Sequence, residues 1–249
     1  MSDVTVWQLG IALIAGVGCG FAKAGMATLG IFNAVLMMQA FPAKEAVGIL
    51  LPILIVADLA AVTLYRRHVA WRHLTSLLPW VLVGIAGGYV LLSAFDDAAL
   101  RPFLGWMLLT LIGMQLWKDY ARPSIRTFAF RSAWSTTSLG ALAGFATTVG
   151  NVSGAVMSMY LFGKKLPKEA FVGTGAWFYL TVNLIKLPLF IQLGMVSSRT
   201  LTVNAAMLPA AAAGMLLGAV VIPRMKQTHF QLAVLLLGAG GALTLALAP

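Results

Sequence analysis

The chain consists largely of apolar segments, each about as long as a membrane-spanning helix. Examples are Ala46–Tyr65, Leu74–Phe95 and Leu100–Trp117. A helix rises about 1.5 Å per residue, so about 20 apolar residues cross the roughly 30 Å hydrocarbon layer of a membrane. The composition agrees, because 60% of the 249 residues are hydrophobic and 10% are charged, against about 25% charged in a soluble domain. These features predict an all-α polytopic membrane protein.

An internal duplication divides the chain into two halves. When the sequence is shifted by 125 residues, Pro42 falls on Pro167 and Asp58 on Asn183. Each half holds one long apolar stretch and then three ordinary segments. In the second half these are Ser132–Gly163, Ala170–Leu193, Leu201–Ile222 and Phe230–Leu247. We therefore predict a first transmembrane repeat (1–117), a cytoplasmic linker (118–131) and a second transmembrane repeat (132–249), since transporters are often built from such repeats.

The first stretch of each half, Val4–Phe41 or Ser132–Gly163, is too long for one span and is interrupted by small or polar residues. Irregular backbone is not tolerated against lipid, so such a break should be buried or should line a cavity. We expect each stretch to form a hairpin of two shorter helices that meet at the break.

The basic residues distinguish two topologies, because cytoplasmic loops are enriched in Lys and Arg. With four crossings in each half, eight basic residues lie on one side and seven on the other. If each hairpin enters and leaves on the same side, the second half is inverted and the count becomes twelve inside against three outside. The three are Lys44, Arg101 and Arg199. We therefore predict two inverted repeats, each a broken-helix hairpin plus three transmembrane helices, with both termini outside.

Three charged residues, Lys23, Asp58 and Lys186, lie inside apolar segments. A charge at the bilayer centre costs roughly 2.5–3.5 kcal/mol on insertion scales, so such residues usually mark a functional site. Lys186 follows Asn183 by three positions and shares its helical face. Asp58 has two interpretations. It forms a buried structural ion pair with Lys23 or Lys186, or it is a protonatable coupling residue while Lys186 faces a substrate anion.

The two breaks contain residues suited to binding an anion. A half-helix N-terminus offers free N–H groups and a partial positive charge, and inverted repeats bring both breaks near the membrane midplane. The alternative is that small residues only permit close helix packing, which we favour for Gly16/Gly20, Gly84/Gly88 and Gly214/Gly218. The predicted substrate-binding residues are Lys23, Gly25, Thr147, Thr148, Asn151, Ser153, Gly154, Asn183 and Lys186, with Asp58 as the coupling residue.

Several function classes are disfavoured. The sequence has no G-x-S-x-G, H-E-x-x-H or Walker motif and only seven Asp and Glu residues, so we expect no enzyme activity, no cofactor and no metal. The single Cys19 excludes an internal disulfide. The net charge of +10 fits a topology signal better than a nucleic-acid partner. The expected partners are a small anion and membrane lipids, with a homodimer as an option.

In the breaks and in the segments that contain the buried charges, the chain resembles the TauE/SafE sulfite exporter family, also called the 4-toluene sulfonate uptake permease family. The resemblance rests on Gly20-Phe-Ala-Lys23-Ala-Gly25, Leu51-Pro-Ile-Leu-Ile-Val-Ala-Asp58 and Asn183-Leu-Ile-Lys186-Leu-Pro188. It implies a permease of the bacterial inner membrane that moves sulfite or an organosulfonate, here with periplasmic termini. Many members have a Gly-rich run after the position of Gly25, where this chain has Met26-Ala27-Thr28.

We therefore expect a secondary transporter that works by alternating access around a midplane site. The alternatives are an anion channel with the same lining, a transporter of short carboxylates, and a membrane-embedded accessory protein without flux.

Overall fold

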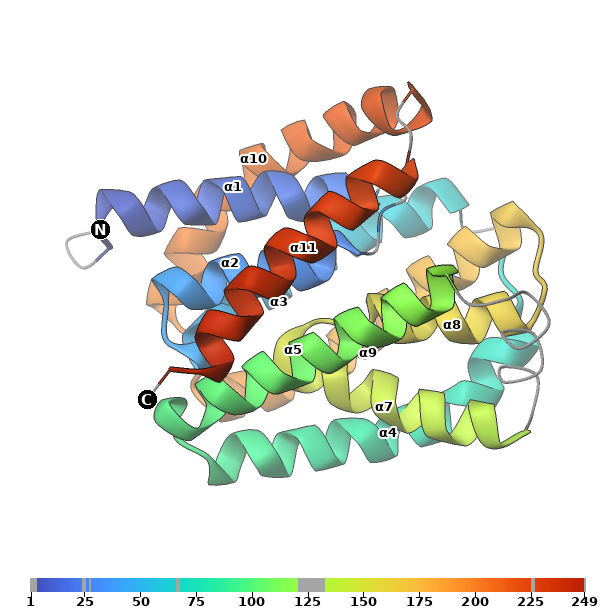
Figure 1. Cartoon of the computed structure of the whole chain (residues 1–249), viewed down its shortest axis with the longest axis horizontal. Helices are drawn as coiled ribbons and strands as arrows, with labels where there is room; N and C mark the ends of the chain where they lie inside the picture. The colour runs from blue at the N-terminus through green and yellow to red at the C-terminus, as the bar shows by residue number, and fades with distance from the viewer. Residues whose placement is uncertain are drawn as a thin grey trace.

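The structure is a computed structural model, and it is helical throughout the residues it describes (Figure 1). These residues are 4–23, 26, 28–65, 68–120, 133–224 and 227–248. They form ten α-helices and one 3-10 helix and include no strand. The predicted all-α fold is therefore confirmed.

The helices follow the predicted apolar segments, with each long stretch divided in two. The first half comprises α1 (Val6–Lys23), α2 (Leu29–Ala40), α3 (Ala43–Tyr65), α4 (Trp71–Ala94) and α5 (Asp97–Tyr120). The second half comprises α7 (Ala133–Gly150), α8 (Gly154–Gly163), α9 (Lys168–Gln192), α10 (Ser198–Val221), η1 (Ile222–Arg224) and α11 (Gln227–Ala246). Because α5 continues to Tyr120, the first residues of the predicted linker are helical, and its remainder lies outside the described residues.

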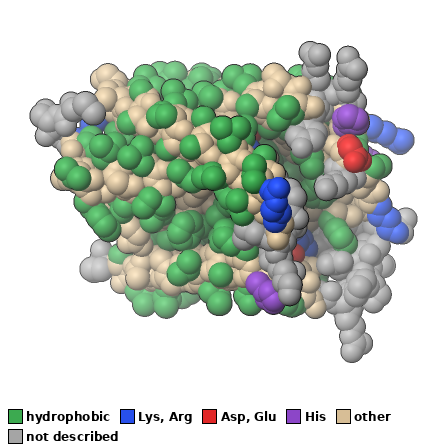
Figure 2. Space-filling view, turned by 90° about the horizontal axis from the view of Figure 1, so that it is seen from above, with side chains coloured by type: hydrophobic (Ala, Val, Ile, Leu, Met, Phe, Trp, Pro, Cys, Tyr) green, Lys and Arg blue, Asp and Glu red, His purple; other side chains and the backbone are tan. Residues whose placement is uncertain are grey.

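Helix length and surface composition are those of a multi-pass membrane protein. Seven helices (α1, α3, α4, α5, α9, α10 and α11) are long and apolar enough to cross a membrane, and α2 and α8 are shorter apolar helices. Large side chains such as Val90, Leu216 and Leu237 are more than 60% exposed, which a lipid environment explains. Figure 2 shows hydrophobic side chains over most of one face, with charged side chains gathered toward one end.

Each broken stretch folds back on itself. In the first, the Gln8 side chain near the start of α1 donates to the backbone oxygen of Ala40 at the end of α2 (2.9 Å). Near the break, the Asn33 amide contacts the Cys19 sulfur at 3.5 Å. In the second, Lys164 just after α8 donates to Thr136 in the first turn of α7 (3.2 Å). The two helices of each stretch therefore run antiparallel, as expected for a hairpin.

Helix packing repeats between the halves under the 125-residue shift. α1 packs on α10 as its counterpart α7 packs on α4, α2 packs on α11 as α8 packs on α5, and α3 packs on its own counterpart α9. The pair α3 and α9 is antiparallel, because Asp58 contacts Asn183 while Ala70, beyond the end of α3, donates to Thr174 near the start of α9. Antiparallel self-paired helices are consistent with a twofold axis across the bundle and thus support the inverted-repeat prediction.

The bundle has a terminal end and a linker end. Both termini lie at one end, and the ends of α5 and α7 that border the linker lie at the other (Figure 1). The three basic residues predicted outside gather at the terminal end. There, Arg199 pairs with Glu45 at 3.1 Å, the Lys44 backbone N–H donates to Asp97, and Arg101 donates to the backbone oxygen of Met38. The count of twelve to three placed these three residues on the same side of the membrane, and their grouping at one end agrees with it. Which side of the membrane that end faces stays a prediction.

Glycines allow the closest helix contacts. A Cβ at Gly84 or Gly20 would overlap the backbone of α7 or α10, and one at Gly88 would clash with Thr148. A Cβ at Gly214 would overlap the Val17 backbone in the same way, and one at Gly16 would lie in tight contact with the Met207 backbone oxygen. The packing interpretation is confirmed for these five residues.

Candidate functional site

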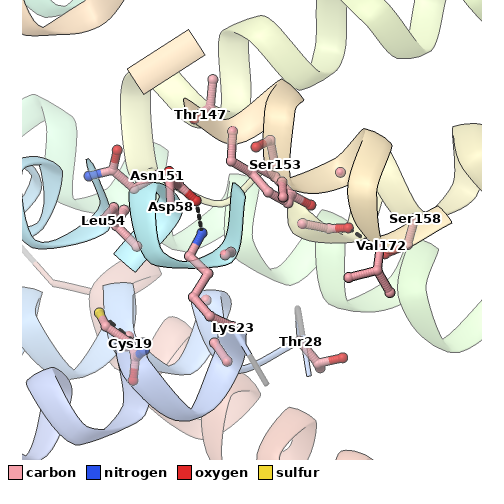
Figure 3. Close-up of a pocket in the computed structure, with 18 of the residues that line it drawn as sticks. Cys19, Lys23, Thr28, Leu54, Asp58, Thr147, Asn151, Ser153, Ser158 and Val172 are labelled. Atoms are coloured by element: carbon pink, nitrogen blue, oxygen red, sulfur yellow. Dashed lines mark hydrogen bonds and ion pairs between the residues drawn. The ribbon is translucent and has the colours of Figure 1, made fainter. Parts of the chain in front are cut away.

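A cavity of about 320 Å³ lies where the two broken stretches meet α3 and α9. It is lined by Lys23, Thr28 and Gly30 of the first hairpin and by Asp58 of α3. The second hairpin adds Thr147, Asn151, Ser153 and Gly154, and α9 adds Tyr179 and Asn183. Several of these side chains surround the same space in Figure 3.

An ion pair between α1 and α3, both in the first repeat, occupies one wall of the cavity. The Lys23 ammonium, at the end of α1, lies 2.5 Å from Asp58 Oδ1 (Figure 3). Asn183 donates to Asp58 Oδ2 at 2.7 Å, so each carboxylate oxygen has a partner. Lys23 also lies over the ring of Tyr179, 4.7 Å from its centroid. The structural interpretation of Asp58, as the partner of Lys23, is therefore realised in this conformation.

Asp58 and Asn183 are related by the internal duplication and touch one another. Residues at equivalent positions can meet only close to the axis that relates the two halves. With the predicted inverted repeats, the polar centre of the molecule would lie on this axis, between α3 and α9.

Lys186 lies behind the cavity wall. Its side chain is completely buried, and its ammonium donates to the Thr147 backbone oxygen (2.8 Å), the Thr147 hydroxyl (3.0 Å) and Asn151 Oδ1 (2.6 Å). These three acceptors match the three N–H groups of an ammonium. Lys186 does not line the cavity, so the structure brings it to the site without placing it in contact with the open space.

The two short helices present their N-termini to the cavity. Thr28 precedes α2 and Ser153 precedes α8, and neither side chain accepts a cap hydrogen bond from the first turn. Both residues line the cavity, together with Gly30 and Gly154. In α2 the Leu29 and Ile31 N–H groups already donate to the backbone oxygens of Met26 and Thr28, so Gly30 is the residue of its first turn that can offer an N–H. The first turn of α8 leaves its N–H groups and a partial positive charge for another acceptor, and an anion is the usual one.

Not every predicted residue lines the cavity. Lys23, Asp58, Thr147, Asn151, Ser153, Gly154 and Asn183 do. Thr148 is fully buried, donates to the Gly144 backbone oxygen on its own helix and packs toward Gly88, so it faces away. Gly25 lies outside the described residues.

The cavity is also lined by residues that the sequence analysis did not predict. Tyr179 precedes Asn183 by four positions, so helical periodicity offered a signal for it. Gln115, Lys118 and Gln231 also line the cavity, but they belong to α5 and α11, and their sequence positions carry no sign of proximity to the breaks.

A charged cavity between two broken helical stretches of a multi-pass protein is an arrangement typical of membrane transporters. The chain is a member of the sulfite exporter TauE/SafE family, whose sequence model matches residues 9–245. Comparisons with curated proteins and with solved structures gave no match. The family match confirms the resemblance seen in the sequence, and it marks the chain as a membrane transporter of a family linked to sulfite export.

Proposed function

We propose that the chain is a secondary transporter that moves sulfite or an organosulfonate across the bacterial inner membrane, with periplasmic termini. The observation that carries this proposal is the charge of the site. Lys118 pairs with Asp119, and the other two ammonium groups, Lys23 and Lys186, lie near one carboxylate, Asp58. Lys186 makes no ion pair among the described residues. A buried excess cation is unfavourable in a membrane, and a bound anion offsets that cost.

The neutral groups of the site suit an oxyanion. Ser153 and Thr28 line the cavity with hydroxyl groups, and the Asn151 amide has a second N–H besides the one that it donates to Val47. The first turn of α8, together with Gly30 of α2, adds backbone N–H groups. An oxyanion accepts several such hydrogen bonds at once, and helix N-termini bind it without a counter-ion. Half-helix N-termini facing a substrate are a recurring arrangement in transporters.

Alternating access is supported by unequal exposure of equivalent residues. Met37 is completely buried, whereas its counterpart Phe162, 125 positions on, is 37% exposed. Phe162 lines the cavity together with Lys118 and Gln231, at the linker end. Toward the terminal end, Gly48 packs tightly on the Met195 backbone, and Asn204 donates to the backbone oxygen of Ile49. This asymmetry supports a conformation open toward the linker and closed toward the termini.

A charge series at the site tests the proposal. Binding of sulfite and of short organosulfonates to purified protein is measured by calorimetry for Asp58→Asn, wild type and Lys23→Met. We expect affinity to fall in that order by at least about tenfold per unit charge, because close charges interact strongly away from bulk water.

Lys164→Met is the matched control. Like Lys23, Lys164 donates a hydrogen bond from its ammonium, in this case to a threonine, and lies over an aromatic ring, that of Tyr160. Unlike Lys23, it does not line the cavity. Its affinity should equal that of wild type. The same affinity throughout the series, or preferential binding of short carboxylates over all sulfur oxyanions, would reject the proposed substrate class.

Coupling to protons through Asp58 is a second part of the proposal. Its carboxylate is completely buried, and both of its oxygens are held by Lys23 and Asn183. Release of Lys23 during the transport cycle would leave a carboxylate that gains stability by binding a proton. Wild-type uptake should therefore respond to a pH gradient and Asp58→Asn uptake should not. If uptake by both proteins responds equally to the pH gradient, Asp58 is not the coupling residue.

A further inference from the structure

We propose that Lys186 is a positioning residue, which holds the second break in shape through Asn151 and does not itself contact the anion. This inference rests on the proposed function for its meaning in transport, but its structural part stands independently. It also differs from the sequence-based expectation that Lys186 faces the substrate.

All donors of Lys186 are used within the protein. Two point to the backbone oxygen and hydroxyl of Thr147 and one to Asn151 Oδ1, at 2.6–3.0 Å. The ring of Phe190 lies on another side of the ammonium, 5.5 Å from it to the centroid. An anion could reach Lys186 only by displacing Asn151 or Thr147, which form the cavity wall between them.

Asn151 links the second break to two neighbouring helices. Its backbone is in the left-handed region (φ 56°), which asparagine tolerates better than most residues. Its side-chain oxygen accepts from Lys186 of α9, and its side-chain nitrogen donates to the Val47 backbone oxygen of α3 at 2.9 Å. Both ends of the amide are thus tied to helices outside the hairpin.

The end of α7 is held by the same ammonium. The Thr147 backbone oxygen accepts from the Asn151 backbone N–H (3.0 Å) and from Lys186. A cation at a helix C-terminus is favourable, because the last carbonyl groups carry a partial negative charge. Lys186 therefore fixes where α7 stops and how the chain turns toward Ser153 and Gly154 at the start of α8.

At the first break, the ammonium group at the helix end comes from the broken helix itself. There, Lys23 lies in the last turn of α1 itself and reaches the cavity. Each broken helix thus ends at an ammonium, but one contacts the cavity and the other is a support behind it. The geometry assigns anion contact to Lys23 and support to Lys186.

A double-mutant cycle tests whether Lys186 acts through Asn151. The variants are Lys186→Met, Asn151→Gly and the double variant; glycine keeps the positive φ without strain. We expect each single change to lower anion flux in proteoliposomes about tenfold, and the double change to lower it by about the same factor, because residues acting as one unit are not additive. A loss of about a hundredfold in the double variant would mean independent contacts and would overturn the proposal.

A cysteine at position 153 reports on the break without requiring transport. In a Cys19→Ala, Ser153→Cys background, a small thiol reagent should label slowly, since Ser153 is only 2% exposed. Lys186→Met and Asn151→Gly should each raise the rate about tenfold by loosening the local structure, whereas Lys164→Met should not. Unchanged labelling in both variants overturns the proposal. If Lys186→Met does not fold, Asn151→Gly alone decides by the same criterion.

The two proposals fail in distinguishable ways. If wild-type protein neither binds nor moves sulfur oxyanions, the proposed function is wrong, and the labelling rates still decide the role of Lys186. If transport is found but labelling at position 153 is unaffected, the function stands and the positioning role falls.

Discussion

At the scale of single residues, the site depends on the partners of one buried carboxylate. Asp58 has Lys23 on one oxygen and Asn183 on the other, and it is completely buried. Removing one partner of a buried ion pair leaves a charge without compensation, which is more harmful than replacing both partners by neutral groups.

We therefore predict that Lys23→Met lowers the free energy of unfolding by about 3–5 kcal/mol. The double variant Lys23→Met, Asp58→Asn should recover most of that loss. Thermal unfolding in detergent measures both. Equal destabilisation of the single and the double variant would show that the ion pair is not what stabilises this part of the protein.

Residue identities at the site were partly predictable. Lys23, Asp58 and Asn183 stood out because a charge or amide inside an apolar helix needs a partner, and the structure supplies that partner from the same short list. Their individual roles were not predictable. Which of the two lysines reaches the cavity depends on the rotation of α9 relative to α7, and hydrophobicity does not encode that rotation. Thr148 faces away for the same reason.

At the scale of helices, packing is controlled by glycine. Contacts between α4 and α7 and between α1 and α10 place backbone against backbone at Gly84, Gly144, Gly20 and Gly214. A methyl group at such a position forces the helices apart, and overpacking typically costs about 1–3 kcal/mol.

Gly84→Ala should therefore lower the unfolding temperature by several degrees, and so should Gly214→Ala in the interface between α1 and α10. Gly113→Ala is the matched control, because nothing lies near an added Cβ there and alanine favours the helix. Similar unfolding temperatures for the wild type, Gly84→Ala and Gly113→Ala would contradict the close-packing interpretation.

The helices themselves were largely predictable, since long apolar runs fix their number and the breaks at small and polar residues fix where two of them divide. Their ends were less so. α5 continues past Trp117 to Tyr120, where Gln115 donates to Asp119 and Lys118 pairs with Asp119. Local polar contacts of this kind extend a helix beyond its apolar segment.

At the scale of the whole molecule, the two repeats are equivalent in topology but not in exposure. Met37 and Phe162 occupy equivalent positions, and only Phe162 is open to the cavity. A twofold-related mechanism would exchange these environments during transport, because each conformation of one repeat is available to the other.

A thiol-labelling experiment on Cys19→Ala protein follows from this asymmetry. Phe162→Cys should react rapidly with an impermeant reagent added on the cytoplasmic side, and Met37→Cys should react slowly and only from the periplasmic side. Substrate should change the two rates in opposite directions, since it shifts the balance between the two conformations. Rapid labelling of both positions from a single side would contradict alternating access.

In the proposed function, a sulfur oxyanion is carried by a cavity that opens to one side at a time. Counterflow in proteoliposomes tests it most directly: vesicles loaded with unlabelled sulfite or organosulfonate are diluted into a trace of the labelled anion. A carrier predicts transient accumulation of label above equilibrium, which Lys164→Met retains and Lys23→Met reduces. Label that only approaches equilibrium, without overshoot, would indicate a channel, and no entry of any sulfur oxyanion would contradict the proposed function.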